Sequence, residues 1–535
     1  MVAIPSRHRS LALLAGVLLA QILMLAVQIK RDSRGRHARA WLGAGGRGGG
    51  GGGVAGVVVV VCALAMVPSG KIPRVVIAAT ASGAGKTTAT VALIGAMRAR
   101  GLKVAAFKCG PDYLDPTYHE RAAGVRSHNL DGWMMDRDAV IATFTRASAG
   151  ADVAVIEGMM GLFDSATPTG DEGSTAQIAK WLGAPVILVI DASGIARTIA
   201  AVAAGFARFD PAVAVAGMIC NRVGSRGHLD LLRAARPEIP VVGGFPASSD
   251  LAFPERHLGL LMADESTVPQ RSIDGWSRLA ADWLDLDAIV EIARSAPALE
   301  DGRESSASKI DLAARPQARI GIAYDAAFHF YYEDNLNRLR ALGAQLVNFS
   351  PIRDRELPES DGLYFGGGYP EVFARELSSN GAMLAALGAF AARGGVIYAE
   401  CGGLMYLTDA IRTLDGAVWP MAAIVPGVAV MSDRLQAIGY VEVETNADSI
   451  LGPAQTRFRG HQFRYSTLEG ARSGDRFDTI YNVAPRWGGA PFAEGYRVGN
   501  VLASYVHAHW ASNPAVAEAL IRACIRSRAS RQPAA

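Results

Sequence analysis

A buried strand that runs directly into a glycine-rich loop and then a helix limits the fold of this chain more than any other feature. Residues 75–79 form a short, β-branched apolar run, and residues 80–88 read Thr-Ala-Ser-Gly-Ala-Gly-Lys-Thr-Thr. Residues 87–100 have the pattern of a helix that stops at Gly101. This order predicts a P-loop α/β domain, because the loop amides at the helix start can bind phosphate.

The loop predicts a nucleotide site, although Thr80 stands where such loops usually carry their first glycine. Its two glycines allow the backbone to curl around phosphate, and its lysine offers positive charge to the β and γ phosphates of ATP. A chance match is the alternative, and the strand and helix on either side argue against it. The residues that we expect to contact the nucleotide are Ser82, Gly83, Ala84, Gly85, Lys86, Thr87 and Thr88.

Carboxylates after two further strands predict a Mg²⁺ site beside the loop. Glu157 follows the apolar run at residues 153–156, and Asp112 lies shortly after the run at residues 104–107. Ligand groups gather at the carboxyl ends of the strands in open α/β sheets. We therefore expect Thr87, Glu157 and Asp112 to hold Mg²⁺, although either carboxylate could instead cap a helix or form a turn.

Other polar residues near this edge are candidates for binding. Asp115 and Tyr113, in the segment at residues 108–116, are expected to reach the substrate, and Asp115 could also reach the phosphates or the metal. Asn221 follows the run at residues 213–219 and could bind the adenine ring, or could simply be a turn residue.

Short apolar runs alternate with helical stretches in two blocks of the chain, which a polar, aperiodic linker separates. Such alternation predicts an α/β protein with two doubly wound domains built on parallel sheets. The predicted segments are an apolar and glycine-rich extension at 1–70, a P-loop synthetase domain at 71–296, the linker at 297–317, a second α/β domain at 318–526 and a tail at 527–535.

A cysteine nucleophile is predicted in the second block. The run at residues 396–399 leads through Glu400 into Cys401 and two glycines, and residues 404–407 are helical. This is the strand, tight turn and helix of a nucleophile elbow. Because a helix amino terminus stabilises a thiolate, we expect a lowered pKa for Cys401. A buried structural cysteine is the alternative.

Such a nucleophile needs a general base and an oxyanion hole. His507 and His509, near the end of the chain, are the candidate bases, and either could instead be a core histidine. The glycine loop after the run at residues 363–365 could supply the oxyanion donors, in particular Gly367 and Gly368.

Composition excludes several classes of protein. The 535 residues are 50% apolar and 19% charged, with a formal net charge of +3, which argues against disorder and against nucleic-acid binding. The five cysteines are scattered without a CxxC pair, so neither a disulfide framework nor a zinc site is predicted. A reducing compartment, the cytoplasm, fits this cysteine usage.

The amino terminus allows two interpretations. Residues 11–29 are almost uniformly apolar and long enough to span a bilayer, with basic residues on both sides. They could anchor the protein to a membrane with its domains facing the cytosol. Alternatively, translation could begin near Met66, which would remove this run and the glycine tract at residues 43–53.

Six motifs together resemble the cobyrinic acid a,c-diamide synthases, a family of the cobalamin pathway, over residues 73–525. The motifs lie at residues 82–88, 108–116, 366–371, 400–404, 458–461 and 504–509. The resemblance implies a dethiobiotin-synthetase-like P-loop domain joined to a class I glutaminase domain. It also implies that Cys401 forms a glutamyl thioester and that His507 activates this cysteine.

The chain departs from ordinary triad glutaminases at one position. His509 stands two residues beyond the catalytic histidine, where those enzymes usually carry Glu. It is therefore an accessory residue or a replacement for the third triad member, and a two-residue site is the alternative. His461, at the end of the motif at residues 458–461, is expected to touch the substrate or to stabilise the domain interface.

The resemblance implies a ligase reaction. MgATP phosphorylates two acetate carboxylates of a corrin ring in turn, and ammonia released from glutamine attacks each acyl phosphate. Cobyrinic acid is the implied substrate, with hydrogenobyrinic acid and nickel sirohydrochlorin as alternatives. Cobyric acid synthases are disfavoured, since their closing motif resembles Tyr-Ile-His-Gly rather than the Tyr-Val-His-Ala-His of residues 505–509. A membrane-attached P-loop nucleotide switch is a distant alternative, which would not need a cysteine elbow.

Overall fold

The structure is a computed structural model that describes residues 71–165, 167–247, 255–256, 259–260, 263, 267–299, 317–470 and 477–531. These residues all belong to one compact unit, Gly70–Ala535. The predicted extension at residues 1–70 and most of the predicted linker lie outside the described ranges. No helix inside those ranges is long and apolar enough to cross a membrane, and the apolar run at residues 11–29 lies outside them.

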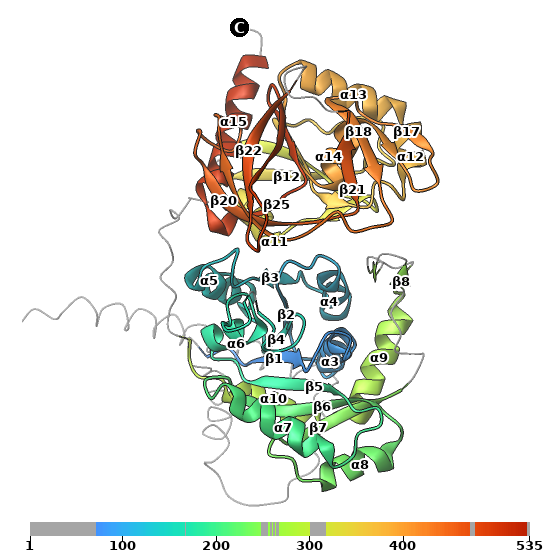
Figure 1. Cartoon of the computed structure of the whole chain (residues 1–535), viewed down its shortest axis with the longest axis vertical. Coiled ribbons are helices and arrows are strands. Elements are labelled where there is room, and N and C mark those ends of the chain that lie inside the picture. Colours follow the sequence, from blue (N-terminus) through green and yellow to red (C-terminus); the bar gives the residue numbers. More distant parts are fainter. Residues whose placement is uncertain are drawn as a thin grey trace, which may run out of the picture. The chain divides into compact units, whose positions relative to one another are not determined.

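A parallel sheet of seven strands forms the first half of the described chain, coloured blue to green in Figure 1. Its strand order is β3-β2-β4-β1-β5-β6-β7, so the strand before the phosphate loop is central. The strands are β1 (Arg74–Ala79), β2 (Val104–Cys109), β3 (His128–Leu130), β4 (Val153–Glu157), β5 (Val186–Asp191), β6 (Val215–Val223) and β7 (Val241–Pro246), with a separate pair β8 (Glu255–Arg256) and β9 (Gly259–Leu260).

Helices cover both faces of this sheet, as a doubly wound fold requires. Val75 and Ile77 of β1 pack into one apolar core with α3, α9 and α10, whereas Val76 and Ala78 pack into the other with α5, α6 and α7. The helices are α3 (Lys86–Ala99), α4 (Asp115–Ala123), α5 (Arg137–Ala147), α6 (Thr175–Leu182), α7 (Thr198–Phe209), α8 (Arg226–Ala234), α9 (Gln270–Trp283) and α10 (Leu286–Ser295).

A mixed sheet of ten strands forms the second half, coloured yellow to red in Figure 1. Its order is β12-β10-β13-β15-β24-β23-β22-β19-β20-β25; the strands from β12 to β24 are parallel and the later pairs are antiparallel. The ten strands are β10 (Ala318–Ala323), β12 (Ala344–Phe349), β13 (Gly362–Phe365), β15 (Val396–Glu400), β19 (Ala437–Thr445), β20 (Arg457–Arg464), β22 (Asp478–Pro485), β23 (Phe492–Val498), β24 (Val501–Ser504) and β25 (His507–His509).

Smaller elements complete this half. One short sheet has the order β17-β16-β18-β21, and β11 pairs with β14. These strands are β11 (Phe328–Phe330), β14 (Gly367–Gly368), β16 (Thr408–Arg412), β17 (Val418–Pro420), β18 (Val425–Met431) and β21 (Ser466–Glu469). The helices are α11 (Glu333–Ala341), α12 (Ala374–Ser379), α13 (Gly381–Ala392), α14 (Gly402–Leu407) and α15 (Ala515–Arg531).

The α/β architecture predicted from the sequence is confirmed, with two local differences. The antiparallel part of the second sheet was not predicted, because its strands alternate apolar and polar residues instead of forming continuous apolar runs. In the first half, β6 continues past residue 219 to Val223, so Asn221 lies inside the strand and not after it.

Both reactive loops begin at the carboxyl end of an interior strand. The phosphate loop follows β1, and Cys401 follows β15. The carboxyl ends of parallel strands therefore set the position of the reactive loop in each half.

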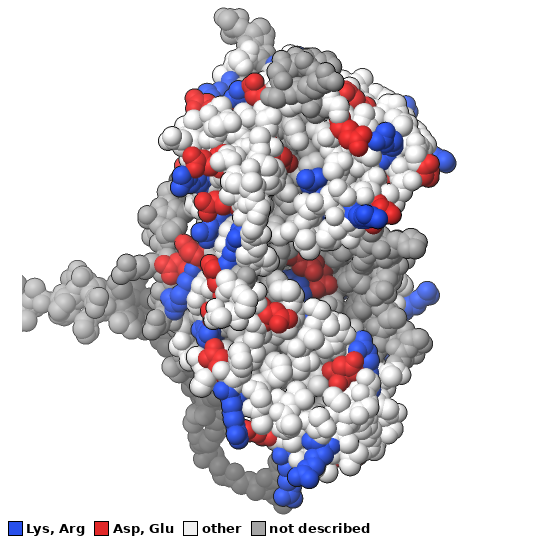
Figure 2. All heavy atoms as spheres, in the orientation of Figure 1, with Lys and Arg blue, Asp and Glu red and all other residues white. Residues whose placement is uncertain are grey.

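On the face drawn in Figure 2, acidic and basic side chains are interspersed.

Candidate active site

The phosphate loop leads from β1 into α3 through a glycine with a left-handed backbone. Gly85, with a φ of 99°, directly precedes α3, and a side chain there would strain the backbone. A Cβ atom at Gly85 would also lie 2.1 Å from Nδ2 of Asn221. This amide donates a hydrogen bond of 2.9 Å to the carbonyl of Ala84. Asn221 therefore supports the loop, and its role in binding adenine stays a prediction.

Lys86 and Thr87 begin α3 and present polar atoms beside the loop. Lys86 Nζ donates to the carbonyl oxygen of Met160 at 2.5 Å, and burial together with the charge of Lys108 lowers the pKa of Lys86. A triphosphate would offer this ammonium an anionic partner in place of a neutral carbonyl. Thr87 Oγ1 donates to Glu157 Oε1 at 2.7 Å.

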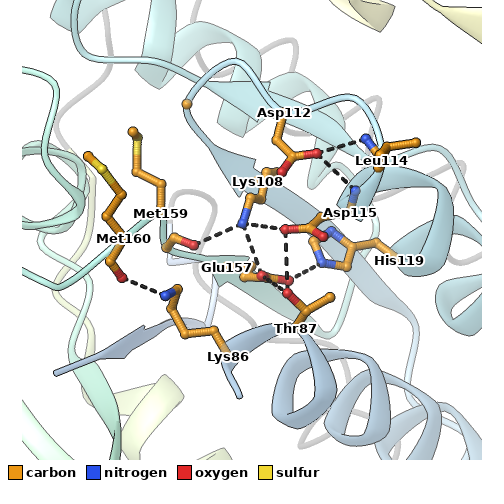
Figure 3. A network of polar contacts seen from close by, with 12 residues as sticks. Lys86, Thr87, Lys108, Asp112, Leu114, Asp115, His119, Glu157, Met159 and Met160 are labelled. Carbon is orange, nitrogen blue, oxygen red and sulfur yellow. Dashed lines mark hydrogen bonds and ion pairs between the residues drawn. The ribbon is translucent and has the colours of Figure 1, made fainter. Parts of the chain in front are cut away.

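Glu157, at the end of β4, is the centre of a buried polar network (Figure 3). Its Oε1 accepts hydrogen bonds from Thr87 and, at 2.9 Å, from Lys108, while its Oε2 lies 2.6 Å from Nε2 of His119. Burial alone would raise the pKa of Glu157, but the charge of Lys108 and the hydrogen bond from His119 lower it far below its ordinary value. The carboxylate is therefore ionised.

Lys108 lies between two carboxylates in this network. Its Nζ is 2.6 Å from Asp115 Oδ2 and 2.9 Å from Glu157 Oε1. Although burial alone would lower it, the charges of Asp115 and Glu157 raise the pKa of Lys108, which stays protonated. Figure 3 shows this ammonium with Glu157, Asp115 and Thr87 around it. The oxygens around Lys108 Nζ therefore stabilise a positive charge at this point.

The oxygens around Thr87 fit the Mg²⁺ predicted from the sequence. A hydroxyl and two carboxylates are hard ligands of the kind that Mg²⁺ prefers, and the ion usually completes its shell with phosphates and water. Within the described ranges, no group of three or more His, Cys, Asp or Glu side chains is placed to hold a metal ion alone. The donor set therefore suits a metal that arrives with its nucleotide.

Asp115 lies nearer than Asp112 to the hydroxyl of Thr87, although the sequence predicted Asp112 as the Mg²⁺ ligand. Thr87 Oγ1 lies 3.4 Å from Asp115 Oδ2. Asp112 Oδ1 instead accepts hydrogen bonds from the backbone amides of Leu114 and Asp115, at 2.7 and 3.0 Å, and so caps the start of α4. Both aspartates line the cavity described below.

His119 is a further polar residue of this network that was not predicted from the sequence. It is fully buried on α4, and its Nδ1 lies 3.2 Å from the hydroxyl of Ser127, which orients the ring toward Glu157. One signal was available: His119 comes four residues after Asp115, so both side chains lie on the same face of the helix.

Cys401 occupies a strained turn between β15 and α14. Its φ is 49°, in the left-handed region that is costly for a residue with a side chain. The turn packs closely on the glycine loop, because a Cβ atom at Gly402 would lie 3.0 Å from the amide nitrogen of Gly368. The elbow and the predicted oxyanion donor are therefore adjacent.

The lowered pKa predicted for Cys401 is wrong. Burial raises the pKa of this thiol to about 12, and the carboxylate of Glu371 acts in the same direction. The helix after the cysteine, α14, is only six residues long, and its dipole does not offset the loss of water around the sulfur. Cys401 therefore rests as a thiol.

One cavity of about 1060 Å³ is lined by both reactive loops. The lining residues include Lys86, Thr87 and Asp115 from the first half and Gly368, Cys401 and His507 from the second. Cys401 and the phosphate loop therefore border the same cavity.

His507 enters this cavity from β25. It lies opposite His461 of β20 in the sheet, and the two rings stack with centroids 4.9 Å apart. Gly367 packs against the imidazole, since a Cβ atom there would lie 2.4 Å from Cε1. Burial lowers the pKa of His507 to about 3. The ring is therefore neutral at pH 7, and a pKa this low makes it a weak proton acceptor.

The ring of His509, the other candidate base, packs against Tyr332 with ring centroids 4.6 Å apart. The buried Nδ1 of His507 has no hydrogen-bond partner in the part of the chain that the structure describes. Neither observation assigns a third triad member, so the two-residue site and the role of His509 stay predictions.

Glu400 joins the strand of the nucleophile to the strand of the base. Its Oε1 accepts hydrogen bonds from the amide of Ala508 at 3.0 Å and the hydroxyl of Tyr398 at 2.8 Å, and its Oε2 accepts one from Tyr364 at 3.0 Å. Ala508 directly follows His507. From the sequence Glu400 was predicted only as part of the elbow, because two of its partners, Tyr364 and Ala508, come from distant segments.

Tyr113 links the two halves of the site. Its ring stacks on Phe330 with centroids 5.1 Å apart and lies 5.2 Å from the ring of His507. Two residues later, Asp115 contacts Lys108 in the first half. One short segment thus touches both reactive sites. The predicted contacts of Tyr113, Asp115 and His461 with substrate stay predictions.

Two substitutions of Glu400 should distinguish the effect of its hydrogen bonds on glutamine hydrolysis from the effect of its charge. Glu400→Leu removes the acceptor for Ala508 and should lower kcat/KM for glutamine hydrolysis about 10-fold or more, since a small shift of the base is costly. Glu400→Gln keeps an acceptor oxygen and should stay within about 3-fold of the parent. Release of glutamate measures both, with ATP binding as the control. Equal losses in the two variants would contradict this role.

The same carboxyl should make stability depend on pH. Burial raises the pKa of Glu400 from 4.5 to about 7, so the folded protein binds this proton more tightly than the unfolded chain does. Its contribution to stability is therefore greatest below pH 4.5 and is lost as the pH rises to 7. The thermal midpoint of Glu400→Gln should rise relative to that of the parent between pH 4.5 and 7. Above pH 7 the difference between the two midpoints should stay constant. A constant difference would exclude the shift.

The comparisons with known proteins cover both halves. The CobQ/CobB/MinD/ParA nucleotide binding domain family matches residues 75–260, and the CobB/CobQ-like glutamine amidotransferase domain family matches residues 319–515. A cobyrinate a,c-diamide synthase of Leptospira interrogans is 49% identical over 456 residues, which cover 85% of this chain and 99% of the relative. The enzyme of the same name from Syntrophotalea carbinolica is 44% identical over 458 residues, or 84% and 98% of the two chains. The resemblance predicted from the motifs is confirmed, and the chain is a glutamine-dependent ligase of the cobyrinate a,c-diamide synthase family.

Proposed function

We propose that this chain converts cobyrinic acid to its a,c-diamide, with glutamine as the nitrogen donor and ATP as the activating reagent. The observation that carries the proposal is the single cavity lined by both the cysteine elbow and the phosphate loop. A ligase of this kind has to release ammonia and activate a carboxylate within reach of each other. A nucleotide switch would have no use for the first of these sites.

The first reaction releases ammonia at Cys401. His507, neutral at pH 7, takes the thiol proton as the sulfur attacks the amide carbon of glutamine. The amide of Gly368, beside the elbow, would stabilise the oxyanion that forms. The protonated His507 then gives its proton to the departing ammonia. Water hydrolyses the thioester, so that glutamine and water yield glutamate and ammonia.

The second reaction activates a carboxylate of the corrin at the phosphate loop. The carboxylate attacks the γ phosphorus of ATP and ADP leaves, which gives an acyl phosphate. Lys86 and the loop amides would balance the charge that moves to the β phosphate. Ammonia then attacks the acyl carbon and displaces phosphate. Repeating the cycle on a second acetate gives the diamide.

Mg²⁺ would be held beside the nucleotide by Thr87, Glu157 and Asp115, the oxygens that lie closest together. Bound there, the ion would neutralise phosphate charge and orient the nucleotide. Lys108 holds the two carboxylates in place by its contacts with both. Asp112, which caps α4, would act indirectly by fixing the segment that carries Asp115.

We also place the reaction in the cytosol. Cys109, Cys220, Cys401 and Cys524 are buried and form no disulfide in the described part of the chain, as suits a reducing compartment.

The test of the proposed reaction is mass spectrometry of cobyrinic acid incubated with the full chain, MgATP and glutamine. Two successive conversions of acid to amide are expected. Hydrogenobyrinic acid and nickel sirohydrochlorin, run in parallel, measure the preference for the macrocycle. Faster conversion of either alternative would replace cobyrinic acid as the substrate, and the absence of any amide with all three would overturn the proposal.

Two variants should divide the reaction into its halves. Cys401→Ser should lower glutamine-dependent synthesis by roughly 10³-fold or more but retain synthesis driven by ammonium, because only the ammonia supply is lost. Lys86→Ala should abolish synthesis from both nitrogen sources, because the carboxylate is no longer activated. Amide formation with glutamine and with ammonium chloride at high pH measures each variant. Ammonium-driven synthesis by Lys86→Ala would refute the role of the phosphate loop.

A further inference from the structure

Large apolar side chains are exposed at the cavity of this ligase. Ile438 of β19 lies opposite Phe463 of β20 in the antiparallel pair, and their side chains are 69% and 44% exposed. Trp487, which follows β22, is 52% exposed. All three line the cavity. Grouped apolar exposure at the rim of a cavity usually marks a binding surface, since water contact with such groups is unfavourable.

The same face of the β19–β20 pair continues to the catalytic histidine. Tyr440 lies two residues after Ile438 on β19, so the two side chains share a face. Tyr440 is paired with His461, which is in turn paired with His507 of β25. This row of rings is buried, whereas Ile438 and Phe463 are open to water. The exposed pair is thus the outer end of a wall whose inner end is the glutaminase site.

Apolar lining also reaches the phosphate loop. Met160, 38% exposed, lines the cavity, and its carbonyl oxygen accepts the hydrogen bond from Lys86. Methionine side chains adapt their shape to the molecule that they contact. A ligand that covers the apolar rim would therefore find apolar contacts up to the point where a carboxylate is to be activated.

We propose that Ile438, Phe463 and Trp487 form a platform that binds the apolar face of the corrin macrocycle while an acetate on its rim reaches the phosphate loop. The proposal rests on the proposed function and names the surface that selects its substrate. A corrin is a broad, nearly flat ring with apolar faces and carboxylates around its edge, so it can cover such a platform and still present an acid group to the loop. A protein partner on the same residues would block the cavity that the reaction needs.

The platform should contribute to the affinity for corrin and to nothing else in the reaction. Ile438→Ser and Phe463→Ser in the full chain should each raise the Kd for cobyrinic acid about 10-fold, which corresponds to about 1.4 kcal/mol. Titration of the coloured corrin against tryptophan fluorescence measures this affinity directly. Trp487→Phe should keep the affinity within about 3-fold and lose part of the quenching, because the ring stays apolar but no longer reports on the corrin.

Phe209→Ser is the matched control. Phe209 of α7 is 73% exposed and is not among the cavity residues, so its replacement should leave corrin affinity unchanged. The platform variants should retain ATP binding and the thermal midpoint of the parent.

Parental corrin affinity in both serine variants would overturn the platform while the ligase reaction stood. Loss of self-association in those variants, with corrin affinity unchanged, would instead assign the surface to a second copy of the chain and would equally overturn the proposal. Failure of the parent protein to bind any corrin would remove the proposed substrate itself, and the platform with it.

Discussion

The first half of the molecule depends on one buried carboxylate. Glu157 has no contact with water, and an ionised group in that position is tolerated only when it is paired and hydrogen-bonded. Its partners come from three elements: Thr87 from α3, Lys108 from β2 and His119 from α4. Satisfying one charge thus fixes the start of the phosphate-loop helix relative to two neighbouring elements. The loss of a single partner would leave the buried charge without compensation, which would lower the stability of the fold.

The second half uses a buried carboxylate in a related way. Glu400 ends β15 as Glu157 ends β4; Glu400 directly precedes Cys401, and Glu157 accepts a hydrogen bond from Thr87. The partners differ, however. Lys108 and His119 lower the pKa of Glu157, whereas burial raises the pKa of Glu400 to about 7, and the hydrogen bonds from two tyrosine hydroxyls and one amide offset only part of that rise. One carboxylate is kept charged, and the other mainly accepts hydrogen bonds that tie the end of β15 to β13 and β25.

The sequence predicts those parts of the site that are continuous along the chain. The phosphate loop, the cysteine elbow and the run that contains His507 could each be identified because neighbouring residues supply both the geometry and the chemistry. The family followed from these segments together. Glu400 could not be assigned its role, since Tyr364 and Ala508 come from segments far from it in the sequence and meet it only in the folded domain.

Other differences between the site predicted from the sequence and the site in the structure arise from burial and from local backbone turns. The pKa of Cys401 was predicted in the wrong direction because the length of α14 and the depth of the sulfur are properties of the packed domain. Asp112 and Asp115 are equally plausible ligands in the sequence, and the cap that Asp112 forms on α4 distinguishes them. The antiparallel strands were missed because their polar residues interrupt the apolar runs.

The high pKa of Cys401 has a consequence for the durability of the protein. With its pKa raised to about 12 by burial, the sulfur is almost entirely a thiol at pH 7. Peroxides and electrophiles react with the thiolate and hardly at all with the thiol. The burial of Cys401 therefore also protects its sulfur from oxidative damage.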